Sequence, residues 1–120
     1  MKILRSFGNA WNGLKYSFAT QTNFKIHLLL AVMTILAGGG LHISNTEWLI
    51  VLICFVIVLS TELMNTAIEK LADVVHQDIH NGIKLVKDIA AGAVLSTAII
   101  SAVIACVIFL PKIIYFIKSI

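Results

Sequence analysis

Three carboxylates and an amide recur at helical spacing in the stretch STELMNTAIEKLAD, which begins inside an apolar run. The four residues, spaced i, i+3, i+7 and i+11, are Glu62, Asn65, Glu69 and Asp73. On a continuous helix they fall within an arc of about 80° and share one face. Two such carboxylates can hold Mg²⁺ through their oxygens, and a third carboxyl can accept a proton from an attacking hydroxyl. These are the parts of a phosphoryl-transfer site, which works by positioning and charge neutralisation.

Acidic side chains are costly inside a bilayer, by about 3 kcal/mol or more, so they usually face a bundle interior and mark a functional path. The simpler interpretation is a carboxylate at a helix end that reaches interfacial water, and we favour it for Asp73 alone. For Glu62 and Glu69, with Asn65 between them, we favour a functional role. A transport path would use the same stripe, but the spans carry no comparable acids in their other halves.

The elements that position this stripe are predicted to be membrane spans. The chain has 120 residues, of which 59% are hydrophobic and 12% charged, and its mean hydropathy is +0.97. A soluble domain of this size is normally more polar. A transmembrane helix needs about 20 mostly apolar residues. Three stretches qualify, at about residues 26–43, 48–67 and 90–110, and we expect one all-α membrane domain over residues 1–120.

Small residues are frequent in the third span. They are Ala90, Ala91, Gly92, Ala93, Ala98 and Ala102, and they allow helices to approach closely. Because three spans enclose little inner surface, we expect a homo-oligomer that completes the core.

Basic residues are distributed unevenly around the spans. Before the first span and between the second and third lie Lys2, Arg5, Lys15, Lys25, Lys70, Lys84 and Lys87, against Lys112 and Lys118 elsewhere. Because basic residues favour the cytoplasmic side, the N-terminal segment and the second loop are expected there. No signal-peptide pattern follows Lys2 and Arg5, so we expect the N-terminus to be retained.

Residues 3–20 are predicted to form an amphipathic helix. Its apolar face comprises Ile3, Leu4, Phe7, Ala10, Trp11, Leu14 and Phe18, and Arg5, Asn9, Asn12 and Tyr16 lie opposite. Aromatic residues on one side and cations among the polar ones favour a helix that lies on the cytoplasmic membrane surface. Periodicity alone leaves open whether it is only an anchor.

No soluble-kinase motif is present: neither a G-x-x-x-x-G-K-[ST] loop nor a kinase-like glycine loop occurs. The glycines at 38–40 are expected to pack tightly or to end a helix. Lys87 and Asp88 lie at the mouth of the third span, where a cation could meet phosphate and a carboxylate could meet ribose or an amine. They could equally be an interfacial pair that ends the span. The polar loop expected at residues 76–88 is either a connector or the cytoplasmic end of a site.

Histidines and cysteines give no metal signature. His76 and His80 are at i, i+4 but lack an accompanying Cys or a firm helical context. His27, where the first span begins, could contact a lipid headgroup or phosphate. Cys54 and Cys106 lie in apolar runs without C-x-x-C spacing and are interpreted as packing residues.

The segments NFKIHLLLAV, ELMNTAIEKLAD and KDIAAGAVL, in this order, resemble the small prokaryotic diacylglycerol kinase family. The resemblance extends from about Phe7 to Lys112. It implies a homotrimer of three-span subunits with N-terminal surface helices, and composite sites at the cytoplasmic face of the bacterial inner membrane. It also implies transfer of phosphate from Mg²⁺-bound ATP to diacylglycerol or undecaprenol, with no nucleic-acid partner.

The resemblance implies roles for the polar stripe. Glu69 would be a Mg²⁺ ligand that also contacts the nucleotide. Glu62 would be the general base for the lipid hydroxyl, and Asn65 would orient that group. Lys87 and Asp88 match the pair that holds ATP.

The surface helix would contribute to both substrate pockets. The resemblance makes Arg5, Asn9 and Lys15 nucleotide contacts. It places Trp11 over the lipid cleft with Glu62, and we expect Lys25 and His27 to contact the lipid as well.

One residue departs from the family pattern. Gln21 precedes NFKIH where the family usually has a Glu, the second metal carboxylate. An amide oxygen can bind Mg²⁺ but brings no charge, so either the chain is a weakened variant or another acid such as Glu62 compensates.

We therefore expect a membrane lipid kinase. The alternatives are a catalytically weakened homologue with a structural or regulatory role, and a small transport oligomer with a polar path. The first two spans look closer to undecaprenol kinases than to Gram-negative diacylglycerol kinases, but the motifs do not decide the lipid.

Overall fold

A computed structural model, which describes residues 1–76, 78 and 80–120, shows four helices. They are α1 (Lys2–Thr20), α2 (Thr22–Gly40), α3 (Asn45–Val75) and α4 (Asn81–Ser119). The last three are long and apolar enough to cross a membrane. The prediction of an all-helical membrane protein with three spans is confirmed at this level.

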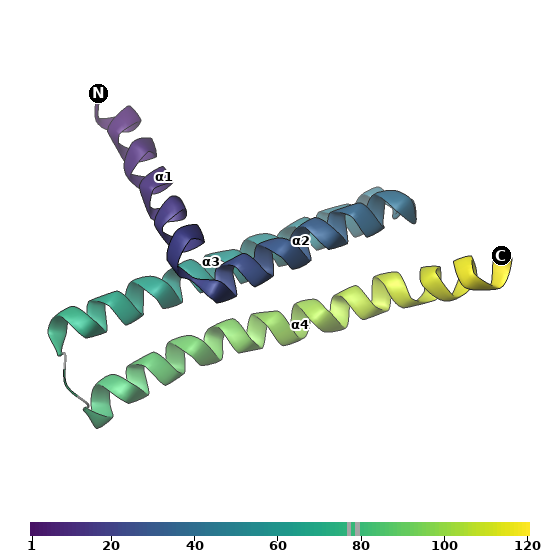
Figure 1. Cartoon of the computed structure of the whole chain (residues 1–120). Coiled ribbons are helices and arrows are strands. Elements are labelled where there is room, and N and C mark those ends of the chain that lie inside the picture. Colours follow the sequence, from purple (N-terminus) through teal and green to yellow (C-terminus); the bar gives the residue numbers. More distant parts are fainter. Residues whose placement is uncertain (77, 79) are drawn as a thin grey trace.

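Helix α3 is the central element, because it packs extensively against α4 on one side and against α2 on the other. With 31 residues it is about 46 Å long, which exceeds a hydrocarbon core of about 30 Å. Helices α2, α3 and α4 run side by side in Figure 1, and the molecule is elongated, with extents of 58 × 42 × 22 Å. A bilayer-spanning α3 must therefore extend into water at one end or both.

The turn end of the bundle, which comprises residues 37–51 and 104–112, is closed by apolar packing. Its buried core is formed by Ile43, Val51, Ile108 and Phe109. A Cβ at Gly38 would lie 2.8 Å from Cη2 of Trp48, so only glycine lets this ring pack against α2. The expectation of tight packing therefore holds for Gly38, whereas Gly39 faces open space.

The turn between α2 and α3 is set by two features that the sequence analysis did not identify. His42 adopts φ 53°, a left-handed conformation that glycine usually provides. Ser44 then caps α3: its Oγ accepts a hydrogen bond from the Glu47 N–H (3.2 Å), and its own N–H donates to Glu47 Oε1 (2.9 Å). This capping box fixes where α3 begins.

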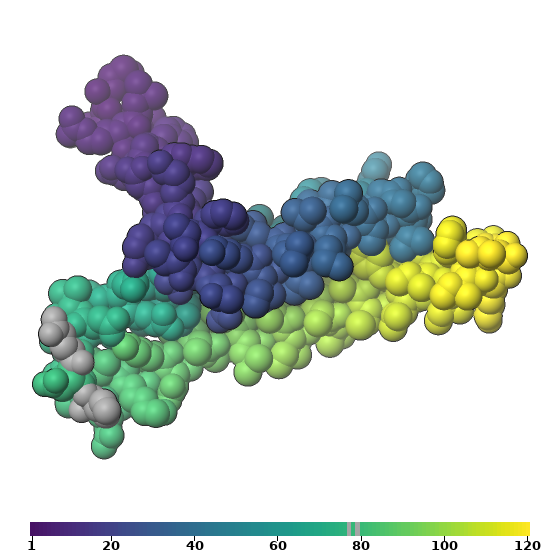
Figure 2. All heavy atoms as spheres, viewed as in Figure 1, coloured from purple at the N-terminus to yellow at the C-terminus, as the bar shows by residue number. Residues whose placement is uncertain are grey.

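At the N-terminal end of α2, α1 projects away from the bundle. Gln21 alone separates α1 from α2, and its extended backbone (φ −105°, ψ 108°) turns the chain sharply. Helix α1 therefore stands away from the other three helices, as the purple atoms in Figure 2 show. Only Ser17 of α1 is buried.

The connection between α3 and α4 is shorter than expected. The prediction of a polar loop over residues 76–88 is wrong, because α4 already begins at Asn81. The side chain of His80 supplies the cap, with its Nδ1 accepting from the Gly82 N–H at 3.0 Å. Polar composition did not end the helix, because side chains on an exposed helix can remain hydrated. Helix α4 also continues through Pro111.

Candidate functional site

The acidic stripe lies on one uninterrupted helix, as the spacing predicted, and its exposure rises along α3. The side chain of Glu62 is 3% exposed, and that of Asp73 is 55% exposed. Asn65 and Glu69, between them, are half-buried. The stripe therefore leads from the interior of the bundle to its surface. We call this region, with residues 21–27 and 84–88, the polar end.

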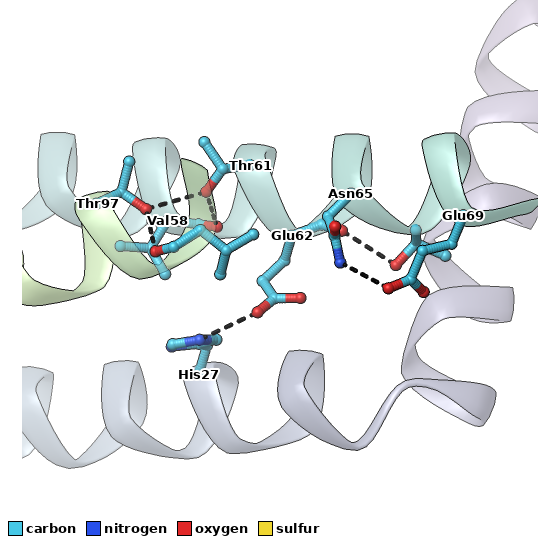
Figure 3. A network of polar contacts seen from close by, with 9 residues as sticks. His27, Val58, Thr61, Glu62, Asn65, Glu69 and Thr97 are labelled. Atoms are coloured by element: carbon cyan, nitrogen blue, oxygen red, sulfur yellow. Dashed lines mark hydrogen bonds and ion pairs between the residues drawn. The ribbon is translucent and has the colours of Figure 1, made fainter. Parts of the chain in front are cut away.

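Glu62 is paired with a residue of the neighbouring helix. Its Oε1 lies 3.2 Å from Nε2 of His27, which extends from α2 toward α3 (Figure 3). A buried charge without a partner would be strongly disfavoured. His27 was expected to contact the lipid, and nothing in the spacing of residues 27 and 62 along the sequence indicates that they meet.

Asn65 and Glu69 form the next pair along α3. Asn65 Nδ2 donates to Glu69 Oε1 at 3.2 Å, one helical turn away (Figure 3). In the described part of the chain, Asn65 Oδ1 is the one buried side-chain polar atom without a hydrogen-bond partner. A buried acceptor left unpaired is costly, and such atoms are often completed by a ligand.

Lys87 and Asp88 do not pair with each other. Lys87 Nζ lies 2.6 Å from Asp73 Oδ1 and so joins α4 to α3 at the end of the stripe. Asp88 Oδ2 accepts from Lys84 Nζ at 2.6 Å, within α4. Both pairs are largely exposed, so their net contribution to stability is small. Phosphate could therefore displace Asp73 from Lys87 at little cost.

The surface-helix residues lie away from the stripe. Arg5, Asn9, Trp11 and Lys15 are all exposed, and α1 projects from the bundle in Figure 1. In the described ranges, no hydrogen bond or ion pair joins these side chains to the stripe. Within one chain, the structure does not bring them to Glu62 or Glu69.

Two cation–aromatic contacts hold the base of α1, and the sequence analysis anticipated neither. Lys70 Nζ of α3 lies 5.8 Å from the centroid of the Tyr16 ring. Lys25 Nζ of α2 lies 5.9 Å from that of Phe18. Such contacts are typical of partly exposed cations near aromatic faces. The one on Lys70 connects α1 directly to the helix that carries the stripe.

Oxygen donors suited to Mg²⁺ are present, but few. The described residues contain no group of three or more His, Cys, Asp or Glu that could hold a metal. Asn65 Oδ1, which is unpaired, and the carboxylate of Glu69, one helical turn away, are hard oxygen donors on the same face of α3. Gln21, half-buried at the α1–α2 junction, bonds through Nε2 to Thr20 Oγ1 at 3.2 Å. Oxygen donors of these types fit Mg²⁺ that is shared with phosphate oxygens and water.

The family model described as prokaryotic diacylglycerol kinase matches residues 8–109. The chain belongs to the prokaryotic diacylglycerol kinase family. The match covers α2, α3 and most of α1 and α4, and so includes the whole polar end. The prediction of a lipid kinase is confirmed at the level of the family.

Relatives in this family differ in their named substrate. A diacylglycerol kinase of Synechocystis sp. is 40% identical over 110 residues, which are 91% of this chain and 63% of that protein. An undecaprenol kinase of Bacillus subtilis is 37% identical over 111 residues, 92% of this chain and 90% of that protein. A diacylglycerol kinase of Escherichia coli strain K12 is 21% identical over 107 residues, 89% of this chain and 88% of that protein. The lipid is therefore not decided by similarity.

Proposed function

We propose that this protein transfers the γ-phosphoryl group of Mg²⁺-bound ATP to the hydroxyl of a membrane lipid alcohol, undecaprenol or diacylglycerol. The observation that carries the proposal is a buried carboxylate, Glu62, next to an unpaired amide oxygen, Asn65 Oδ1, at one end of three apolar helices. A lipid alcohol brings its hydroxyl to this depth while its chains stay in the bilayer.

Glu62 acts as the general base. The lipid oxygen attacks the γ-phosphorus, the bond from that phosphorus to the β,γ-bridging oxygen breaks, and ADP leaves. The hydroxyl proton passes to the Glu62 carboxylate. Asn65 orients the hydroxyl through Nδ2: one of its N–H groups is bonded to Glu69, and the other can donate to a lone pair of the lipid oxygen while the hydroxyl proton goes to Glu62.

Glu69 and the phosphates of ATP would hold Mg²⁺. The amide oxygens of Asn65 and Gln21 would be additional, uncharged donors. When bound, the ion neutralises charge on the phosphoryl group. Lys87 and Asp88 bind the nucleotide, and Lys87 exchanges Asp73 for a phosphate. Arg5, Asn9 and Lys15 of α1 reach a nucleotide bound at the polar end of a neighbouring subunit.

We propose a homotrimer in the bacterial inner membrane. Most Leu, Ile and Val residues of α2, α3 and α4 are exposed in the single chain, which supports their being covered by lipid and by further subunits. We place α1 on the cytoplasmic membrane surface, with Trp11 in the lipid cleft and Lys25 at the headgroups. The polar end, with the N-terminus and the second loop, then faces the cytoplasm, where ATP is available.

ATP consumption in mixed micelles tests this proposal. The protein is assayed with undecaprenol, diacylglycerol or no lipid, as wild type, Glu69→Ala and the control Glu47→Gln at the turn end. We expect one lipid alcohol to stimulate phosphate transfer in the wild type and the control, and Glu69→Ala to be inactive. The proposal fails if no lipid alcohol stimulates transfer or if Glu69→Ala matches the wild type.

A catalytically weakened homologue is the second candidate, and Gln21 favours it. Without the carboxylate usual in the family, the site has one acid fewer for Mg²⁺. A wild-type protein that binds ATP and Mg²⁺ but transfers phosphate to neither lipid would support this alternative.

A further inference from the structure

We propose that His27 is a positioning residue for Glu62, not a lipid contact. The proposal rests on the proposed role of Glu62 as the general base. Its basis is the 3.2 Å contact between His27 Nε2 and Glu62 Oε1 across the α2–α3 interface (Figure 3). The imidazole is charged only when it is protonated, and the protonated ring and the carboxylate then form an ion pair across the interface.

The burial of the pair makes this contact important for orientation. The Glu62 side chain is 3% exposed and that of His27 is 20% exposed, so water competes little with the contact. A glutamate side chain has three rotatable bonds, and α3 alone does not fix its carboxyl group. The contact engages Oε1, and Oε2 is then the oxygen that receives the proton of the lipid hydroxyl.

His27 also lines an apolar groove. The groove, of about 340 Å³, is lined by residues of α2, α3 and α4, including Ala31, Phe55 and Ala102. His27 is the first lining residue on α2, whereas Glu62, one turn beyond the lining residue Leu59 on α3, is not in the lining. The imidazole therefore contacts the carboxylate and also forms part of the groove wall.

This arrangement predicts what the loss of His27 would do. Without the imidazole, the Glu62 carboxyl loses its side-chain partner on α2 and can rotate toward the space that His27 occupied. The nucleotide contacts proposed for Lys87 and Asp88 lie on a different helix and do not depend on His27. The defect should therefore appear in kcat and not in the KM for ATP.

Steady-state kinetics of His27→Leu and His27→Gln test the inference. Leucine fills a similar volume but cannot make a polar contact with the carboxylate, whereas the glutamine amide can donate a hydrogen bond to Oε1. We expect kcat to fall about 10- to 100-fold in His27→Leu, as on loss of other orienting partners, with the KM for ATP unchanged. His27→Gln should recover most of the activity.

The control is Thr34→Val, which lines the same groove on the same helix. Thr34 Oγ1 bonds to the Leu30 carbonyl of its own helix, at 2.7 Å, so kcat should stay within about twofold. Thermal unfolding in detergent is measured for every variant, and equal midpoints exclude a folding defect as the cause.

Three outcomes overturn the inference. The first is wild-type kcat in His27→Leu. The second is an equal loss in His27→Leu and His27→Gln, which indicates packing alone. The third is a change confined to the apparent KM for lipid, which indicates a direct lipid contact. Glu62→Gln, assayed in parallel, separates the two proposals: if it keeps the wild-type kcat, the general-base role itself fails.

Discussion

The two ends of the bundle contrast in how their helices are joined. At the turn end, α2, α3 and α4 meet through a buried apolar core around Ile43 and Phe109, and Gly38 admits the Trp48 ring. Glu47 there has two partners, Ser44 and Lys112. At the polar end, the helices meet through ion pairs between side chains, and Asn65 Oδ1 is left unpaired.

The two ends of the bundle therefore differ in role: the turn end provides stability, and the polar end carries the groups suited to chemistry. Apolar packing can be completed by the chain alone, so the turn end has no remaining need for a ligand. The polar end combines a buried acid, an unpaired acceptor and exposed ion pairs that a phosphate can replace. We infer that the turn end sets the relative positions of α2, α3 and α4, and that the polar end uses these positions for phosphoryl transfer.

The largest effect is expected for Glu62→Gln. Removal of a general base typically costs about 100- to 10,000-fold in rate, and glutamine keeps the size of the side chain. Lipid phosphorylation at saturating substrates measures the loss. The matched change at the turn end, Glu47→Gln, should keep kcat near the wild-type value. An equal loss of kcat in both variants would contradict the proposal that the two ends have different roles.

The second-largest effect is expected for Lys87→Met. A charged hydrogen bond to phosphate contributes about 1.5–3 kcal/mol, so the KM for ATP should rise about 10- to 100-fold. Lys118→Met is the control, because Lys118 is exposed in the last turn of α4, at the other end of the helix from Lys87. Initial rates against ATP concentration give both values. If Lys118→Met raises the KM as much as Lys87→Met, the nucleotide assignment of Lys87 is wrong.

Gly38→Ala should act on stability without changing the chemistry. The new Cβ would lie 2.8 Å from the Trp48 ring, and overpacking of this kind costs about 1–3 kcal/mol. Gly39→Ala is the control, because a Cβ there meets nothing within 4 Å. Denaturant unfolding in detergent compares the two variants. A kcat of folded Gly38→Ala far below the wild-type value would show that the turn end also affects the reaction.

Gln21→Glu should have the smallest effect, in the opposite direction. A carboxylate in place of the amide adds a charged oxygen donor for Mg²⁺, so activity at limiting Mg²⁺ should rise several-fold. Activity at saturating Mg²⁺ should change little. A titration of rate against Mg²⁺ checks this prediction, and an unchanged or lower rate at limiting Mg²⁺ would mean that Gln21 does not lie near the metal.

Much of the polar end could be predicted from local patterns. The period of Glu62, Asn65 and Glu69 placed them on one helical face, and α3 is indeed continuous through Val75. Residues 3–20 were predicted as a helix, and α1 spans Lys2–Thr20. The polar loop after α3 was predicted too long, because polarity indicates hydration and does not by itself end a helix.

The sequence by itself determined the helices, the three apolar spans and the acidic stripe, because helical periodicity and hydropathy are properties of neighbouring residues. Only the tertiary structure decided which side chains from different helices meet. It paired His27 with Glu62, joined Lys87 to Asp73 in place of Asp88, and left Asn65 Oδ1 without a partner. These contacts depend on how α2 and α4 pack against α3, and no spacing along one helix encodes that arrangement.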